Sequence, residues 1–215
     1  MLVAVFQYFS AVLTFVFLKI FTNLEIYGKN NLRELNSRVL VTSNHESHLD
    51  PQLVGVAMIN RPSLFPLRFM AKDAFFYIPV FNILIWLLGS FKAHKKKGIG
   101  KSLLTPVRIL EKNGNVVMFP EGKIIPGRPV LGEGRRGTAI LALTTKATIL
   151  PVSLHTPPKL NPIKIIFGRP KIVINIGEPY FLNNLDYPDF SDENTIKATK
   201  FIMGKIHNLY SQHKY

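Results

Sequence analysis

Short apolar segments typical of β-strands alternate with segments typical of helices along most of this chain. Such an alternation indicates strands joined by helical crossovers, which form a largely parallel sheet. It predicts one α/β domain over residues 24–215, with a mostly parallel mixed sheet flanked by helices. Strands are predicted at Arg38–Ser43, Leu67–Ala71, Asn115–Phe119, Thr148–Leu154, Lys164–Phe167 and Lys171–Ile176, the last two forming a late pair. Helices are predicted at Asp50–Met58, Ala74–Leu88, Lys101–Lys112, Thr138–Thr145 and Asn194–Gln212.

The N-terminal segment is apolar enough to interact with a membrane. Residues 1–18 contain no charged side chain, and Lys19 and Glu25 are the first charges in the chain. A helix that spans a bilayer needs about 20 mostly apolar residues. We therefore expect residues 1–23 to form a membrane anchor helix, which either crosses the bilayer or lies in its plane. A buried core helix is the alternative.

A second apolar segment, residues 74–89, is rich in aromatic side chains and is interrupted by Pro79 and Asn82. It is short for a spanning helix but suits the headgroup region of a bilayer. The basic residues that follow it would face anionic lipid: Lys92, Lys95, Lys96, Lys97 and Lys101. The formal net charge of +14 calls for a polyanionic partner, and a mean hydropathy of +0.16 favours a membrane over nucleic acid.

Two motifs look familiar but lack the context that their chemistry needs. Residues 132–137 fit the glycine pattern of a dinucleotide-binding loop, yet a turn precedes them and no acidic residue follows until Glu178. His45 and His48 flank Glu46 at a spacing of three residues, whereas a zinc protease helix needs a spacing of four. The chain has no cysteine, which excludes a thiolate nucleophile and Cys-ligated zinc. We expect neither a metal nor a cofactor.

The segment from Asn44 to Pro51 follows a predicted strand and precedes a predicted helix. His45 and Asp50 are five residues apart, about 140° around an ideal helix, so they would not share a face of one helix. With His45 in the loop and Asp50 at the helix start, the carboxylate can reach the imidazole. It would then fix the tautomer and leave the other ring nitrogen free as a base. The alternative is that both side chains only cap the helix.

A second polar segment, Phe119–Gly122, follows another predicted strand. By itself its sequence Phe-Pro-Glu-Gly indicates only a turn, because Pro and Gly are common after strands. Ligands of open α/β sheets bind beyond the carboxyl ends of the strands. The polar residues after Ser43, Ala71 and Phe119 are all expected at that edge.

Together these segments resemble the glycerophospholipid acyltransferase family, whose best-known members are the 1-acylglycerol-3-phosphate acyltransferases. Residues 44–50 match the family block N-H-x-S-x-x-D, and residues 119–122 match its later block F-P-E-G. Residues 70–72, 78–81 and 89–91 are similar to the segment between the blocks, and Gly137, Ala142, Pro151 and Val152 resemble the last block.

The resemblance implies that His45 is the general base on the acceptor hydroxyl and that Asp50 orients it. The hydroxyl oxygen would attack an acyl thioester directly, with coenzyme A or acyl carrier protein as the carrier and without a cofactor. The acceptor would be lysophosphatidate, and the product phosphatidate. The protein would be membrane-associated, with its active site facing the cytoplasm. Residues expected to bind substrate are Asn44, Ser47, Lys72, Glu121, Gly122, Lys123, Arg128, Arg135 and Arg136.

The sequence departs from the family at the position that concerns the acceptor. The family's later block continues Thr-Arg-Ser, and its arginine is associated with phosphate, whereas here Lys123, Ile124 and Ile125 follow Gly122. A lysine does not reproduce the bidentate guanidinium fork. One alternative is therefore the same chemistry on another lysolipid or hydroxylated lipid. A second is a non-catalytic basic module that binds membrane or nucleic acid.

Overall fold

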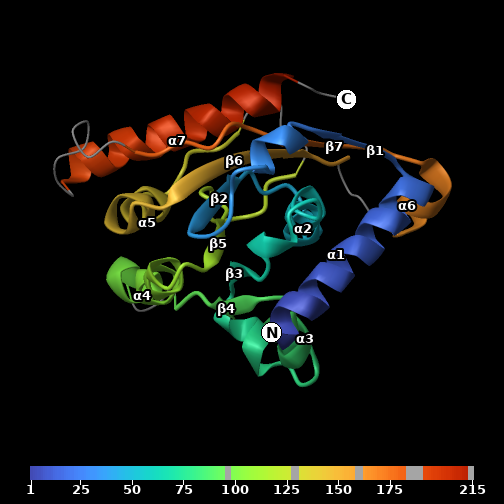
Figure 1. Ribbon diagram of the computed structural model, residues 1–215, viewed down its shortest axis with the longest axis horizontal. Helices are drawn as coiled ribbons and strands as arrows, with labels where there is room; N and C mark the ends of the chain where they lie inside the picture. Colours follow the sequence, from blue (N-terminus) through green and yellow to red (C-terminus); the bar gives the residue numbers. More distant parts are fainter. Residues whose placement is uncertain (95–97, 127–130, 158–161, 183–190, 213–215) are drawn as a thin grey trace.

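A seven-stranded sheet forms the centre of the computed structural model (Figure 1), which describes residues 1–94, 98–126, 131–157, 162–182 and 191–212. The strand order is β1-β7-β6-β2-β5-β3-β4. Only β6 and β7 pair antiparallel, and the other neighbours are parallel. The mostly parallel mixed sheet predicted from the sequence is thus confirmed. The strands are β1 Asn23–Tyr27, β2 Val39–Ser43, β3 Leu67–Ala71, β4 Ser90–Lys92, β5 Asn115–Met118, β6 Thr148–His155 and β7 Lys171–Ile176.

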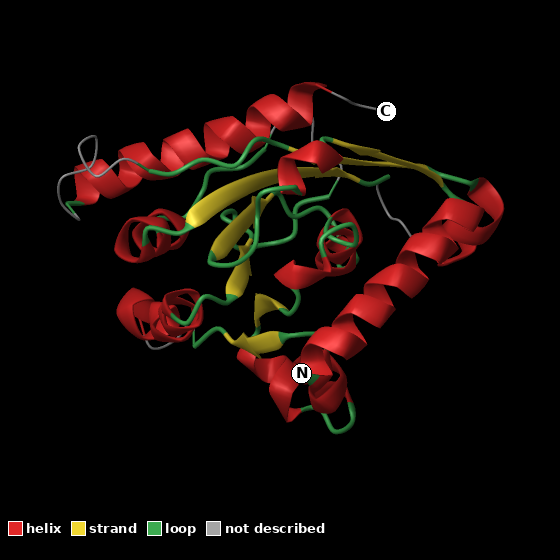
Figure 2. Ribbon diagram, in the orientation of Figure 1, coloured by secondary structure: helices red, strands yellow, loops and turns green. Residues whose placement is uncertain are grey.

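Helices cover both faces of the sheet (Figure 2). They are α1 Leu2–Phe21, α2 Asp50–Ala57, α3 Phe81–Leu87, α4 Gly98–Glu111, α5 Gly137–Thr145, α6 Pro162–Gly168 and α7 Asp192–Gln212. Short 3₁₀ helices occur at η1 Lys29–Leu32, η2 Pro62–Leu64 and η3 Asp73–Tyr77. Consecutive residues of a strand point to opposite faces, so Val39 and Val41 of β2 join the core under α1 and α2, while Leu40 joins the core under α4, α5 and α7. Burial on both faces explains why the central strands are continuously apolar.

Three parallel strands deliver their carboxyl ends to one edge of the sheet. β2 runs beside β5, and β5 runs beside β3, all in the same direction. The residues that follow these strands, Asn44, Phe119 and Lys72, are therefore brought to a common edge, as the sequence predicted.

Two sequence predictions of secondary structure are wrong. Residues 164–167, predicted as a strand from their apolar run, lie within α6. The helix begins at Pro162, whose fixed φ suits a first helical turn, and the side chain of Ile165 is buried. The predicted helix Ala74–Leu88 is divided into η3 and α3, because Pro79 cannot continue a helix and Val80 has a φ of 64°. The short strands β1 and β4 were not predicted.

The N-terminal helix α1 is apolar and packs along the domain with one side only. Its mean hydropathy is 1.9, so by length and composition the helix could cross a membrane. Only 17% of its apolar stretch is buried against the domain. On the packed side, Gln7 accepts a hydrogen bond from the Leu67 amide and donates to the carbonyls of Leu67 and Leu88. Ala11 meets α2, where a Cβ added to Gly55 would lie 3.3 Å from the Ala11 methyl. Immediately after α1 the chain enters β1.

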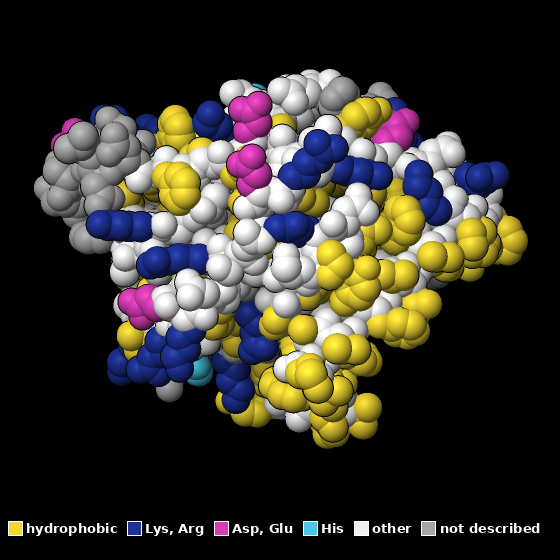
Figure 3. Space-filling model, viewed as in Figure 1, with side chains coloured by type: hydrophobic (Ala, Val, Ile, Leu, Met, Phe, Trp, Pro, Cys, Tyr) yellow, Lys and Arg dark blue, Asp and Glu magenta, His cyan; other side chains and the backbone are white. Residues whose placement is uncertain are grey.

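The other side of α1 exposes large apolar side chains. This surface continues over α3 and α6 and is visible as the hydrophobic area on the right and lower parts of Figure 3. We call these exposed residues of α1, η3, α3 and α6, with those of the η3–α3 connection, the apolar surface. Its members are Leu2, Val5, Phe9, Leu13, Val16, Phe17, Ile20, Tyr77, Ile78, Val80, Phe81, Ile83, Leu84, Trp86, Ile163, Ile166 and Phe167.

Candidate active site

The loop between β2 and α2 is held by side chains rather than by regular backbone pairing. Asn44 is fully buried and exchanges two hydrogen bonds of 2.8 Å with the backbone of Leu154 on β6. These two hydrogen bonds extend the pairing of β2 with β6 by one residue and fix where β2 ends. Asn44 therefore sets the start of the loop, and it does not line the cavity described below.

Asp50, the first residue of α2, organises the rest of the loop. Its Oδ2 accepts hydrogen bonds from the amides of Glu46 at 2.6 Å and Ser47 at 2.9 Å, and its Oδ1 accepts one from the Ser47 hydroxyl at 2.5 Å. The carboxylate is fully buried, and these donors and the imidazole of His45 stabilise its charge. Ser47 thus serves Asp50 and does not line the cavity.

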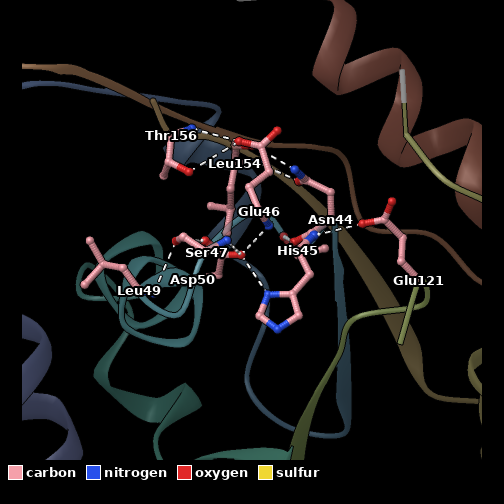
Figure 4. A network of polar contacts seen from close by, with 10 residues as sticks. Asn44, His45, Glu46, Ser47, Leu49, Asp50, Glu121, Leu154 and Thr156 are labelled. Carbon is pink, nitrogen blue, oxygen red and sulfur yellow. Dashed lines mark hydrogen bonds and ion pairs between the residues drawn. The ribbon is translucent and has the colours of Figure 1, made fainter. Parts of the chain in front are cut away.

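His45 connects this network to the cavity. Its Nδ1 lies 2.7 Å from Asp50 Oδ2, and Figure 4 shows the second ring nitrogen pointing away from Asp50. With Asp50 ionised, Nδ1 carries the proton and Nε2 is an acceptor. The ring stacks on Phe119 at a centroid separation of 4.2 Å, which fixes its plane, and 17% of the side chain is exposed. His45 and Asp50 are therefore arranged as a base and its orienting carboxylate.

Glu121 joins the two sequence blocks. Its Oε2 accepts a hydrogen bond from the His45 amide at 3.0 Å, and its Oε1 accepts one from the Gly132 amide at 2.7 Å. The side chain is 3% exposed and is not part of the cavity wall. Glu121 thus holds His45 and the loop before α5 in place, whereas the sequence placed it in contact with substrate.

A cavity of about 1020 Å³ is lined by His45 and by three cationic side chains. Lys72, Lys123 and Arg135 all line it, together with Gly122. Within the part of the chain that the structure describes, no acidic side chain pairs with any of the three. We call Lys72, Lys123 and Arg135 the cation cluster. Three cations in one cavity with His45 form a site for an anionic group.

Arg135 lies where the missing arginine of the family block would be sought. Gly122 has a φ of 67°, and a Cβ built on it would be 2.7 Å from Arg135 Nε. The amide of Arg135 also donates to the carbonyl of Pro120 at 2.8 Å. The loop therefore carries the Arg135 guanidinium against the turn after β5, and only a glycine leaves room for it there.

The other two candidate arginines are not placed in the cavity. Arg136 forms an ion pair with Asp192 at the start of α7, and its side chain is 42% exposed. Arg128 lies outside the described residues. Of the three arginines proposed from the sequence, the structure brings Arg135 alone to His45, among the residues that it describes.

Much of the remaining wall is apolar, with several polar side chains among it, and it reaches α1. It includes Ala11, Gly55, Phe69, Ile85 and Leu88, which come from α1, α2, β3 and α3. The cavity thus offers cations to a charged headgroup and apolar wall to a hydrocarbon chain.

Glu46 is a buried carboxylate whose protonation affects stability. Burial raises its pKa above the usual range and the charge of Asp50 adds to this, while hydrogen bonds from Tyr210 and Thr156 oppose the shift. The folded protein thus holds this proton more tightly than the unfolded chain. The resulting stabilisation is complete below the ordinary pKa of a glutamic acid and is lost as pH rises through the raised pKa.

Glu46→Gln removes this titration. We expect the free energy of unfolding of the variant, relative to the wild type, to rise by the order of 1 kcal/mol from mildly acidic to mildly alkaline pH. Urea denaturation at both pH values measures it. A difference between the two proteins that is independent of pH would contradict the assignment.

Several residues of the site were not predicted from the sequence. Phe119 was recognised as part of a turn motif but not as the ring under His45, and Thr156 and Tyr210 were not considered. Phe119 belongs to the matched block Phe-Pro-Glu-Gly, which follows a predicted strand. Its place near His45 could therefore have been predicted. Nothing local marks Tyr210, which is 164 residues from its partner Glu46.

The order of the two sequence blocks and their meeting at the sheet edge agree with a comparison against known families. The family model described as acyltransferase matches residues 23–155, which is more than half of the chain. The chain belongs to the acyltransferase family. This confirms the resemblance drawn from residues 44–50 and 119–122.

Members of the acyltransferase family with assigned names are distant relatives. The 1-acyl-sn-glycerol-3-phosphate acyltransferase of Bacillus subtilis is 23% identical over 183 residues, 85% of each chain. The enzyme of that name from Haemophilus influenzae is 27% identical over 149 residues, 66% of this chain and 58% of that protein. The crystal structure of the 1-acyl-sn-glycerophosphate acyltransferase of Thermotoga maritima matches with a TM-score of 0.62 and 20% identity, covering 92% of this chain and 76% of that one. This likeness shows the fold.

Proposed function

We propose that this acyltransferase transfers an acyl chain from a thioester to the free hydroxyl of lysophosphatidate, giving phosphatidate. The observation that carries the proposal is a single cavity lined by His45, the cation cluster and a large share of apolar side chains. Lysophosphatidate has the matching parts, a phosphate next to a hydroxyl and one hydrocarbon chain. Relatives that carry the name 1-acyl-sn-glycerol-3-phosphate acyltransferase support the same acceptor.

The proposed reaction uses His45 twice. Nε2 takes the proton of the acceptor hydroxyl as the oxygen attacks the thioester carbonyl, and the imidazolium is stabilised by Asp50 Oδ2 at 2.7 Å. The tetrahedral intermediate then breaks its C–S bond, and the imidazolium returns the proton to the leaving thiolate. The products are an ester and a free thiol, without an acyl-enzyme. Coenzyme A and acyl carrier protein both present such a thioester.

The cation cluster is proposed to hold the acceptor phosphate. A phosphate dianion that leaves water needs charged donors, and an arginine offers two parallel N–H groups to its oxygens. Arg135 is in the position to do so, with Lys72 and Lys123 as additional charges. The absence of an arginine after Gly122 favours, as the second candidate, the same chemistry on an acceptor without a phosphate.

A time course with the purified protein in vesicles tests the function. Lysophosphatidate is supplied with acyl-CoA in one series and acyl carrier protein thioester in the other, and free thiol and phosphatidate are measured together. Equal amounts of both products, from at least one donor, are expected. Thiol release without phosphatidate formation, with either donor, would show that the protein is a thioesterase. No reaction with either donor would contradict the proposed function.

We also propose that α1 lies in the plane of the membrane. Gln7 near its start and Leu18 near its end are both buried in the domain, and β1 follows directly at Asn23. A spanning helix would have to leave all these contacts. The apolar surface would enter one leaflet, and cations at its rim would reach the headgroups. Lys92, whose Nζ lies 4.5 Å from the centre of the Tyr77 ring, is such a cation. Of the other basic residues expected there, Lys101 is exposed on α4, and Lys95–Lys97 lie outside the described residues. An anionic inner leaflet would place the active site on the cytoplasmic side.

The absence of cysteine makes the depth of α1 measurable. Val5, Leu13 and Ile20, which are all exposed, are each replaced by Cys and labelled with a spin probe on vesicles. We expect similar depths for the three probes, about 5–10 Å below the headgroup boundary. A probe at Leu13 near the bilayer centre, with the probes at Val5 and Ile20 near opposite surfaces, would show a spanning helix instead.

A further inference from the structure

Glu46 is a buried carboxylate that the proposed reaction does not use. It occupies the variable position of the block N-H-x-S-x-x-D, between His45 and Ser47. Its side chain is directed away from the cavity and is 5% exposed. Oε2 accepts a hydrogen bond from the Thr156 amide at 2.9 Å, and Oε1 accepts one from the Tyr210 hydroxyl. A burial this complete is expensive for a carboxylate without a structural purpose.

Tyr210 is a firm anchor for this carboxylate. It lies in the last turn of α7 and is 5% exposed, and its ring stacks on His155 of β6 at a centroid separation of 3.9 Å. Ala198, Ile202 and Ile206 bury the same side of α7 in the core above the sheet. The phenol is thus fixed by a stacked ring and by a packed helix, and it cannot follow a movement of the loop.

The backbone of Glu46 connects this anchor to the base. The Glu46 amide donates to Asp50 Oδ2 at 2.6 Å, and the same oxygen accepts the bond from His45 Nδ1. Residues 44–46 have no regular secondary structure, so side chains determine where this amide points. If the Glu46 side chain loses one of its two partners, the amide and the shared carboxylate oxygen can shift together, and the imidazole with them.

We propose that Tyr210 is a positioning residue for the His45–Asp50 pair and acts through Glu46. The C-terminal helix thereby becomes part of the machinery that aligns the base, although it does not line the cavity. This inference rests on the proposed function for its kinetic consequences only. Its structural consequence, the state of the His45–Asp50 hydrogen bond, does not depend on any substrate.

Tyr210→Phe tests the proposal, because it removes the hydroxyl and keeps the ring on His155. We expect kcat to fall on the order of tenfold with KM for both substrates unchanged, since misalignment affects the transition state and not substrate binding. The matched control is Ile206→Val, which weakens the packing of α7 one turn away without touching Glu46. At a similar loss of thermal stability, the control should keep the wild-type kcat.

Two further measurements separate positioning from general destabilisation. In spectra of protein with ¹⁵N-labelled histidine, the Nδ1–H signal of His45 is expected to shift upfield or broaden in Tyr210→Phe and to remain in Ile206→Val. Glu46→Gln can still bond to Thr156 and Tyr210, so it should retain more of kcat than Glu46→Ala. This comparison also decides the question if Tyr210→Phe does not fold.

Equal kcat values for Tyr210→Phe and Ile206→Val, with an unchanged His45 signal, would overturn the proposal. Equal losses in Glu46→Gln and Glu46→Ala would overturn it as well. A wild type without transferase activity would refute the proposed function and leave the spectroscopic comparison to decide the positioning role.

Discussion

His45→Ala is expected to lower kcat by about 10²–10⁴-fold, the usual contribution of a well-placed general base. The His45 imidazole lines the cavity and can take a proton from the acceptor hydroxyl, and Asp50 already holds it in the required tautomer at 2.7 Å. KM for the acceptor should change little, because the cation cluster and the apolar part of the cavity wall remain. Initial rates of thiol release at saturating donor and acceptor measure the effect.

The control for this variant is another exposed histidine. His207 lies on the solvent side of α7, and His207→Ala should retain the wild-type rate. Circular dichroism shows whether both variants are folded. A His45→Ala protein that is folded and turns over within a factor of about two of the wild type would contradict the role of the base.

Arg135→Gln is expected to lower kcat/KM for lysophosphatidate by about 10–100-fold, the range for loss of hydrogen bonds to a charged group. The effect should be confined to acceptors that carry a phosphate. For a monoacylglycerol, which has the same chain and hydroxyls without the phosphate, kcat/KM should stay near its wild-type value. Parallel assays with the two acceptors measure the ratio.

The neighbouring Arg136 provides a matched control. Arg136→Gln makes the same change of charge one residue away, on a side chain that pairs with Asp192 outside the cavity. Its activity on both acceptors should resemble that of the wild type. Equal losses in the two variants would show that only the overall positive charge matters, and an unchanged Arg135→Gln would remove Arg135 from the acceptor site.

The sheet could be predicted because its strands are buried on both faces and are therefore continuously apolar. The strands β2, β3, β5, β6 and β7 all begin and end within one residue of their predicted bounds, and β3 and β7 coincide with them. Such a signal fails for a segment like residues 164–167, Lys-Ile-Ile-Phe, where an apolar run typical of a strand forms part of the helix α6. There the contact of α6 with α1 decides the conformation, and no local pattern reports that contact.

The candidate site also has features that could be predicted from the sequence and features that could not. The proximity of His45 and Asp50 could be predicted, because a loop residue and the first residue of the next helix are neighbours in the chain. The choice among three arginines could not, since it depends on the space above Gly122. Asn44, Ser47 and Glu121 were expected to touch substrate, and instead they hold the loop through hydrogen bonds to Leu154, Asp50 and the His45 amide. A motif names the residues of a site, but their roles follow from the partners that the fold provides.

The family assignment narrows the alternatives drawn from composition. A chain of +14 net charge could belong to a basic binding module, yet its membership of the acyltransferase family supports an enzyme that uses an acyl donor and an acceptor. The basic residues then divide by position, with three in the cavity and others at the rim of the apolar surface. The proposed acceptor, lysophosphatidate, depends most on Arg135.

A competition assay tests this central point most directly. Lysophosphatidate and the corresponding monoacylglycerol are mixed in equal amounts in the same vesicles with one isotopically labelled acyl thioester, and both products are quantified by mass spectrometry. We predict that labelled phosphatidate greatly exceeds labelled diacylglycerol, and that this excess largely disappears in Arg135→Gln. Labelled diacylglycerol as the main product of the wild type would contradict the proposed acceptor, and the absence of both labelled products would contradict the proposed transfer itself.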